Sequence, residues 1–392
     1  MQKSPTLVIV ILLTFFVISF ISNIIGPIIP DLIRSFHLNL TLVSLLPFSF
    51  FIAYGITSIP AGILLETFKE RKIMLAAFVL AGLGSLIFVL FPNFWMALTS
   101  LFLIGTGMAM LQVVINPLLR TAGGEEHYAS NSVYAQLVFG LASFISPMVY
   151  QFFIQQEIPS LPFPWLSLYL LFVGINLVMF VICSKITFPD IRQNDQEKPE
   201  AWAVHLQLFK NKTVFLYFLA MLCYVGTEQG ISTWVSQFLD SYHHLNPQTF
   251  GANTIAYYWG LMTLGGVLGI ILLKFFDSRT ILSATTFFAI IALAFGLFGN
   301  ASVSLIAFPL IGFFVSLIYP IIFSIALNSV KEHHGAFSGI IVTGIVGGAI
   351  FPFLIGGLGD LFGLKIGMTL LFFSLSYIFS IGFWAKPLVS NK

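Results

Sequence analysis

Charged residues are scarce in this sequence. Only 8% of the 392 residues are Asp, Glu, Lys or Arg, whereas 58% are hydrophobic. Ordinary soluble domains have roughly 25% charged and about 45 to 50% apolar residues. So little charge excludes a water-soluble globular protein, since water could not solvate the resulting surface. The sequence therefore predicts a protein whose solvent is lipid, and no nucleic-acid partner is expected.

Cysteine and the known catalytic motifs are also nearly absent. The two cysteines, Cys183 and Cys223, both fall within long apolar stretches, where a thiol behaves as a small hydrophobic group. No disulfide framework or metal cluster is therefore predicted. No His-Glu-x-x-His stretch, phosphate-binding glycine loop or Gly-x-Ser-x-Gly elbow occurs, so an enzyme is not expected. No cofactor is expected either.

Long apolar runs follow one another along the whole chain. A helix needs about 20 apolar residues to cross a hydrocarbon layer roughly 30 Å thick. The sequence therefore predicts an all-α membrane protein with 12 transmembrane helices in two six-helix halves. The expected spans are residues 7–29, 41–65, 73–91, 94–119, 129–153, 165–183, 213–239, 250–273, 280–298, 302–328, 335–359 and 365–385.

Basic residues gather on one side of this arrangement. All but two of the 17 Lys and Arg residues fall on the side of the two termini, and the exceptions are Arg34 and Lys365. Because basic loops stay on the cytoplasmic side of a membrane, both termini are predicted to be cytoplasmic.

A polar stretch divides the chain into two halves. Residues 184–212 contain the longest run of polar residues and read as a cytoplasmic linker, in which residues 201–209 form an amphipathic segment. The expected domains are an N-terminal six-helix half, residues 1–183, and a C-terminal six-helix half, residues 213–392. Two such halves with a site between them are typical of a carrier with alternating access.

Few polar side chains fall inside the predicted spans, and they indicate a site because burial in lipid is costly. We expect Asn23, Gln112, Asn116 and Gln136 to bind a substrate rich in hydroxyl groups, since each amide offers a donor and an acceptor. Hydrogen bonding between helices is the alternative role for these amides. Glu228 is the one carboxylate well inside a span and has no basic partner there, so it is predicted to bind a proton or another cation. Packing as a protonated acid is the alternative for Glu228.

Aromatic residues and helix breakers accompany these polar groups. Tyr224 and Trp259 are predicted to contact the substrate, although anchoring at the membrane surface is the alternative for such residues. Kinks are expected where proline removes a backbone donor, at Gly26-Pro27, Asn116-Pro117, Tyr319-Pro320 and within residues 347–352.

Several stretches carry a resemblance to a known family. They are Ser58-Ile-Pro-Ala-Gly-Ile-Leu64, Leu111-Gln-Val-Val-Ile-Asn-Pro117, Tyr224-Val-Gly-Thr-Glu228, Tyr319-Pro-Ile-Ile-Phe-Ser324 and Gly347-Gly-Ala-Ile-Phe-Pro352 with Asp360. In these stretches the chain resembles the major facilitator superfamily, and within it the fucose, galactose and glucose to proton symporters of bacteria. The resemblance implies the major facilitator fold and a bacterial inner membrane.

The resemblance also implies roles for individual residues. The proton-coupled fucose carriers have an acidic residue at the positions of Gly26 and Gln112, neither of which can titrate, so coupling is expected to fall on Glu228. Gln136 matches a glutamine of those carriers, which implies sugar contact. Residues at cytoplasmic helix ends are expected to latch one conformation, and these are Glu66, Arg71, Asp277 and Arg279.

Together these observations predict a secondary active transporter that imports a neutral monosaccharide, a hexose or deoxyhexose, with H⁺ or Na⁺. An efflux carrier for small amphipathic compounds and a non-transporting sugar sensor are the alternatives. The protein is expected to work as a monomer. The sequence does not identify the sugar, the coupling ion or the direction of transport.

Overall fold

The computed structural model describes residues 5–124, 128–155, 161–186, 188, 207–329 and 334–385, and the regular structure over these ranges is helical. The N-terminal helices are α1 (Pro5–Ser22), α2 (Ile25–Phe36), α3 (Leu40–Thr67), α4 (Glu70–Leu90), α5 (Phe94–Gly123), α6 (Tyr128–Ile154) and α7 (Leu166–Lys185). The C-terminal elements are α9 (Lys212–His243), η3 (Pro247–Gly251), α10 (Ala252–Leu272), α11 (Ser278–Phe298), α12 (Ala301–Val315), α13 (Ile318–Leu327), α14 (His334–Thr343), η4 (Gly344–Val346), α15 (Gly347–Phe362), α16 (Leu364–Met368) and α17 (Leu370–Trp384).

Eleven helical stretches of the described residues are long and apolar enough to cross a membrane. Each overlaps one of the predicted spans. The remaining predicted span, residues 250–273, corresponds to α10, a helix of 21 residues. Length alone allows α10 to span, since 21 residues rise about 32 Å.

Four spans are interrupted, one of them at Thr369 between α16 and α17, and proline accounts for two of the interruptions. The first span breaks at Asn23 and Ile24, between α1 and α2, and another breaks at Ser316 and Leu317, between α12 and α13. Pro27 and Pro320 follow these breaks by four residues, and a proline ring clashes with the carbonyl four residues earlier. A third span becomes a 3-10 helix at Gly344–Val346. The predicted kink at Asn116-Pro117 does not break the helix, because α5 continues to Gly123.

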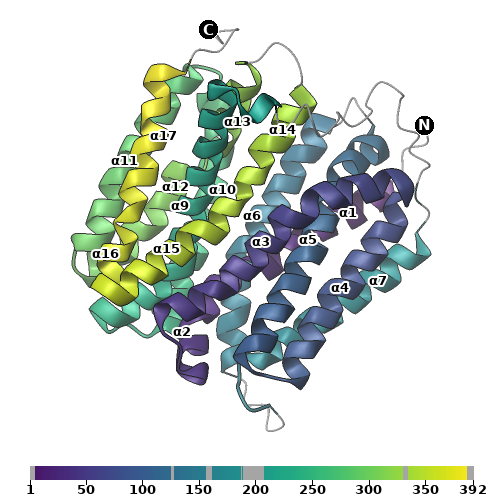
Figure 1. The fold of residues 1–392 in the computed structure, drawn as a ribbon, viewed down its shortest axis with the longest axis horizontal. Coiled ribbons are helices and arrows are strands. Elements are labelled where there is room, and N and C mark those ends of the chain that lie inside the picture. The colour runs from purple at the N-terminus through teal and green to yellow at the C-terminus, as the bar shows by residue number, and fades with distance from the viewer. Residues whose placement is uncertain are drawn as a thin grey trace.

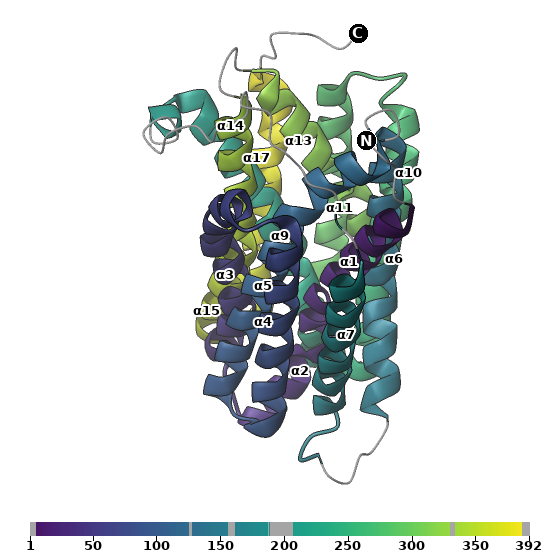
Figure 2. The same cartoon turned by 90° about the vertical axis from the view of Figure 1, so that its right-hand side faces the viewer.

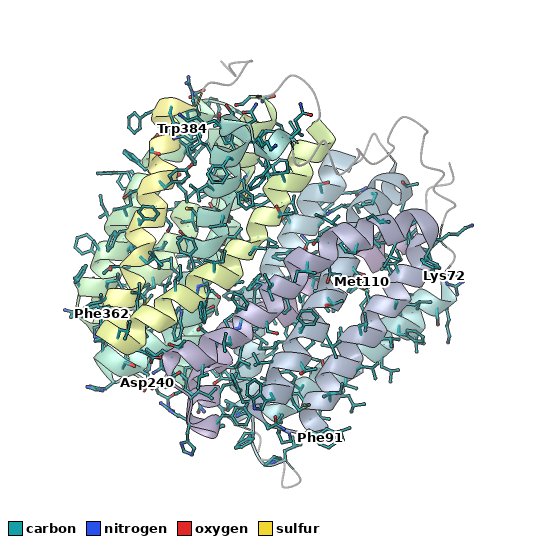
Figure 3. All side chains as sticks on the ribbon, viewed as in Figure 1. Lys72, Phe91, Met110, Asp240, Phe362 and Trp384 are labelled. Atoms are coloured by element: carbon teal, nitrogen blue, oxygen red, sulfur yellow. The ribbon has the colours of Figure 1, made fainter. Side chains whose placement is uncertain are left out.

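The helices form two groups that run between the same two faces of the molecule (Figures 1 and 2). The face that carries Lys72 and Trp384 is called the terminal face here, and the opposite face, with Phe91 and Asp240, is called the distal face (Figure 3). Helices α1–α7 lie on one side and α9–α17 on the other, and the groups contact one another mainly through α2 with α9, α3 with α15 and α6 with α10. Most of the predicted linker, residues 187 and 189–206, lies outside the described residues.

Glycine allows the two groups to approach closely near the distal face. A Cβ atom added at Gly26 of α2 would overlap the backbone carbonyl oxygen of Ser232 in α9. At Gly356 of α15 it would lie 2.6 Å from the carbonyl oxygen of Leu40 in α3. Real Cβ atoms do not come so near, so these helices pack backbone against backbone, as small residues allow in membranes.

Candidate functional site

Glu228 lies near the middle of α9, the longest C-terminal helix. Its carboxylate accepts hydrogen bonds from the hydroxyl of Tyr224, at 2.6 Å, and from the side-chain amide of Gln229, at 3.1 Å. Tyr224 precedes Glu228 by four residues, so the helix itself places both groups on one face. Both partners are buried, whereas Glu228 is only partly buried. The two hydrogen bonds thus hold the carboxyl group in place.

Other tyrosine residues interact electrostatically with this carboxyl group, namely Tyr258 in α10 and Tyr319 in α13. The ring of Tyr319 lies 5.9 Å from that of Tyr224. Tyr54 of α3, in the N-terminal half, donates a hydrogen bond to Oε1 of Gln112 in α5. We call Tyr54, Gln112, Tyr224, Glu228, Tyr258 and Tyr319 the central cluster.

The structure places the other predicted amides differently. Asn116 is exposed and donates to the backbone carbonyl of Gln112, one turn earlier, at 3.2 Å. Gln136 of α6 is also exposed, and it lies one turn before Gly140, which contacts Thr263 of α10. Asn116 and Gln136 therefore keep polar atoms free for a ligand. Their predicted role in binding stays a prediction.

Asn23 forms hydrogen bonds within the N-terminal half. Its side chain is 3% exposed and donates to the backbone carbonyl of Ser19, at 3.0 Å, and to the hydroxyl of Ser143, at 2.9 Å. Ser19 also bonds to the carbonyl of Phe139 at 2.6 Å. These bonds join α1 to α6 beside the break in the first span. Because both amide hydrogens have partners within the N-terminal half, the contacts favour the alternative role, hydrogen bonding between helices.

Trp259 is buried beside the central cluster. Its indole ring lies 5.3 Å from the ring of Tyr258 in an edge-to-face arrangement. Trp259 follows Tyr258 on α10 and is only 5% exposed, which does not fit an anchor at the membrane surface. No group of three or more metal-binding side chains occurs within the described ranges.

The predicted latch residues contact their own halves. Arg71 donates to the backbone carbonyl of Ser184, within the N-terminal half. Asp277 caps α11 by accepting from the amide of Arg279 at 3.1 Å, and Arg279 donates to the carbonyl of Ala385 at 3.2 Å. The side chain of Glu66 lies outside the part of the structure that is described. No latch between the halves is formed at the terminal face by the described members of this set.

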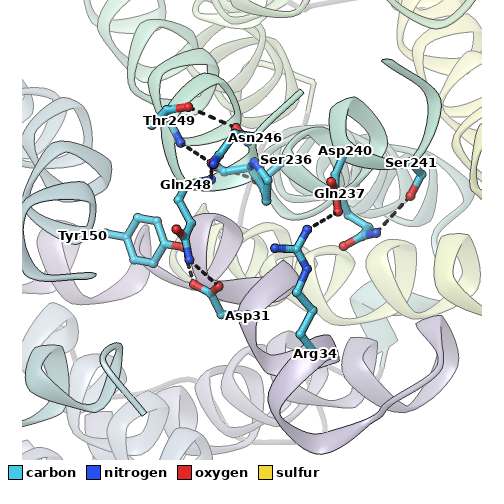
Figure 4. A network of polar contacts seen from close by, with 11 residues as sticks. Asp31, Arg34, Tyr150, Ser236, Gln237, Asp240, Ser241, Asn246, Gln248 and Thr249 are labelled. Carbon is cyan, nitrogen blue, oxygen red and sulfur yellow. Dashed lines mark hydrogen bonds and ion pairs between the residues drawn. The ribbon is translucent and has the colours of Figure 1, made fainter. Parts of the chain in front are cut away.

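Polar contacts between the halves occur instead at the distal face (Figure 4). Arg34 of α2 pairs with Asp240 of α9 at 2.6 Å. Asp31, one turn earlier on α2, accepts from the hydroxyl of Tyr150 in its own half and from the side-chain amide of Gln248 in the other, the latter at 2.9 Å. The distal face is therefore held shut in this conformation.

Asp31 and its network were not predicted. The sequence had suggested that Glu228 is the only carboxylate well inside a span. Asp31 is 6% exposed, so a second carboxylate is buried within the spans. The first predicted span ended at residue 29, whereas α2 extends to Phe36 and carries Asp31 inside the protein. Its partners Tyr150 and Gln248 lie more than 100 residues away in sequence, and no local pattern signals such contacts.

Asp360 makes a further contact between the halves at the distal face. It lies at the end of α15, and its carboxylate accepts from the backbone amides of Leu40 and Thr41 at 2.9 and 2.8 Å. It also accepts from the hydroxyl of Thr41 at 2.5 Å. These amides begin α3, so a carboxylate of one half caps a helix of the other. Asn39, the residue before α3, satisfies the amide of Leu42.

Comparisons with known proteins agree with this architecture. A model of the Major Facilitator Superfamily matches residues 11–351. The glucose/galactose transporter of Brucella abortus is 28% identical over 384 residues, which cover 93% of this chain and 90% of that protein. The solved fucose:proton symporter of Escherichia coli has a TM-score of 0.70 at 21% identity, covering 97% of this chain and 98% of that one. A solved D-xylose-proton symporter has a TM-score of 0.79 at 11% identity, with coverages of 97% and 98%. The two structural likenesses show the fold alone.

Proposed function

Since this chain belongs to the Major Facilitator Superfamily, we propose that it is a secondary transporter that imports a neutral monosaccharide together with a cation. The observation that carries this proposal is the central cluster, where the carboxyl group of Glu228 accepts from Tyr224 and Gln229 and where Tyr54 of the N-terminal half donates to Gln112. Such groups match the hydroxyls of a sugar, which need paired donors and acceptors without net charge. The names of similar proteins, a glucose/galactose transporter and a fucose:proton symporter, favour hexoses and deoxyhexoses.

Each residue has a stated role in the proposal. Gln112, Asn116 and Gln136 bind sugar hydroxyls, while Tyr224 and Trp259 contact the ring. Glu228 carries the coupling ion, H⁺ or Na⁺. Whether the ion is bound determines which arrangement of the two halves is favoured. Movement of the halves about the central cluster then opens the site to one side at a time.

The location and assembly are also proposals. The excess of Lys and Arg that the sequence predicts on the side of the termini favours both termini in the cytoplasm. The similarity to transporters of bacteria favours a bacterial inner membrane. The two six-helix halves, residues 1–183 and 213–392, supply a complete site, so a monomer is sufficient. Reporter domains fused to the C-terminus, one active only in the cytoplasm and one only outside it, test the orientation.

The first test is transport by the purified protein in proteoliposomes. Uptake of radiolabelled glucose, galactose and fucose is measured with a proton gradient, a sodium gradient or neither. Accumulation that follows one gradient identifies the ion. Uptake that depends on neither gradient would indicate a uniporter, which carries the sugar without an ion. Lack of uptake under every gradient would refute the proposal in favour of export or sensing.

The coupling role of Glu228 has a separate test. Glu228→Gln keeps the size of the side chain and one accepting oxygen but cannot titrate. We expect sugar exchange across the membrane to continue while accumulation against a gradient is lost. Glu228→Asp is the matched control, because it keeps the carboxyl group and should keep part of the accumulation. Full accumulation by Glu228→Gln would exclude this role.

A further inference from the structure

Two consecutive residues of α10 carry buried polar atoms that have no hydrogen-bond partner. They are the hydroxyl of Tyr258, whose residue is 1% exposed, and the indole nitrogen of Trp259. Five buried side-chain atoms lack a partner within the described ranges, and only these two share a helix. Native proteins satisfy nearly all buried polar groups, so two such atoms side by side indicate that their partner is a molecule outside the chain.

The side chains of Tyr258 and Trp259 cannot satisfy these atoms by bonding to their own helix. A serine or threonine hydroxyl can rotate to a carbonyl of its own helix, as Thr285 does with Ile281 at 2.8 Å. The hydroxyl of Tyr258 stands at the far end of a rigid ring and cannot turn back in this way. Its backbone is also held in place, because a Cβ atom at Gly312 of α12 would overlap the carbonyl oxygen of Tyr258. The indole of Trp259 is only a donor, so its partner must offer an acceptor.

Tyr258 also interacts electrostatically with Glu228, the group proposed to carry the coupling ion, and with Tyr224. A ligand that bonds to Tyr258 would therefore lie within the electrostatic reach of that carboxyl group. A sugar hydroxyl fits both atoms, since it can accept from an indole N–H and can either donate to or accept from a phenol.

We propose that Tyr258 is a specificity-determining residue, whose hydroxyl, with the indole N–H of Trp259 beside it, binds hydroxyl groups of the transported sugar. This inference rests on the proposed function and adds a requirement to it. The sugar must carry a hydroxyl at the ring position that faces Tyr258, and a derivative that lacks this hydroxyl binds more weakly.

The test combines changes in the protein with changes in the sugar. The Kd of galactose or glucose, whichever binds the full-length protein in detergent, is measured together with that of its 2-, 3-, 4- and 6-deoxy derivatives. Tyr258→Phe removes one oxygen atom and should weaken binding of the parent sugar about 3- to 10-fold, as expected of one neutral hydrogen bond. For one deoxy derivative, the wild type and Tyr258→Phe should have equal Kd values.

Tyr217→Phe is the matched control. Tyr217 is a fully buried tyrosine of the same half, but its hydroxyl has a partner, Ser329, at 3.0 Å. Tyr217→Phe should lower the thermal midpoint and leave the ratios of Kd among the sugars unchanged. Tyr258→Phe without ligand should keep or raise the midpoint, because it removes an unpartnered group.

The outcomes distinguish this inference from the proposed function. If the wild type binds no sugar of the panel, both are overturned. If the wild type binds sugar but Tyr258→Phe weakens all members of the panel equally, or none, the proposed function stands and the role of Tyr258 is refuted. A decrease confined to sugars that carry one particular hydroxyl supports the inference.

Discussion

The carboxylate of Asp360 should keep the distal face closed, because it caps α3 from the opposite half. Asp360→Ala removes three accepted hydrogen bonds, two of them from amides of the first turn of α3. When the distal face opens, the wild type loses the same bonds, so the substitution destabilises only the closed conformation. The cap stabilises that conformation relative to the open one, and the alanine variant should open more often.

The size of this effect follows from the position of the group. An anion at a helix N-terminus contributes about 0.3 to 1 kcal/mol, and replacing a capping residue by alanine costs typically about 1 kcal/mol. Asp360 is exposed to solvent, which weakens charge interactions. We therefore expect about 1 kcal/mol in favour of opening, or roughly a five-fold rise in the open fraction.

Labelling of a buried cysteine measures this fraction. Ser44 is fully buried and lies against Gly356 of the other half, 3.0 Å from the position of an added Cβ. Ser44→Cys should react with a membrane-impermeant maleimide only when the distal face opens. The two native cysteines, Cys183 and Cys223, are buried and give little background. Asp360→Ala should raise the labelling rate about five-fold.

Asn300→Ala provides the matched control. Asn300 caps α12 by accepting from the amide of Val303 at 3.0 Å, and both belong to the C-terminal half. Its loss weakens a helix cap without removing a contact between the halves. If Asn300→Ala accelerates labelling as much as Asp360→Ala, or if Asp360→Ala leaves the rate unchanged, the reasoning fails.

Three further predictions concern the same two halves. Arg34→Asp should accelerate distal labelling about 1.4- to five-fold, because a partly exposed ion pair worth about 0.2 to 1 kcal/mol is lost. Adding Asp240→Arg should restore the wild-type rate, and a double variant as fast as the single one would exclude the pair. Gly26→Ala should place a methyl group against the carbonyl of Ser232 and so separate the two halves there. The labelling rate should rise toward that of a protein with an open distal face, and an unchanged rate would show that the helices shift to make room for the methyl group. Asn23→Ala should lower the thermal midpoint while the KM for sugar stays within about two-fold, because the hydrogen bonds of Asn23 join helices. A large rise in KM with an unchanged midpoint would show instead that Asn23 binds the sugar.

Hydropathy alone predicts most of the fold, because the bilayer fixes the length of an apolar span. The positions of the proline residues predict two of the helix breaks, because the rings of Pro27 and Pro320 clash with the carbonyl four residues earlier. Hydropathy also places α10, since the predicted span of residues 250–273 contains the helix Ala252–Leu272. In the candidate site, the pairing of Tyr224 with Glu228 follows from helical spacing.

Contacts between distant segments could not be predicted in this way. The role of Asn23 depends on Ser143, which lies 120 residues further along the chain. Asp360 caps a helix that begins 320 residues earlier. Such contacts depend on how the halves meet in one conformation of a moving protein, and a single sequence carries no periodic signal for them.

The interruptions in four spans affect how many conformations the protein can visit. A continuous helix transmits movement at one end to the other, whereas a break lets the two segments pivot separately. The segments α13 and α14 lie on the terminal side of their breaks, and α2 lies on the distal side of its own. We expect these short segments to move independently of the longer helices that they continue, so that either face can close without movement of a whole half.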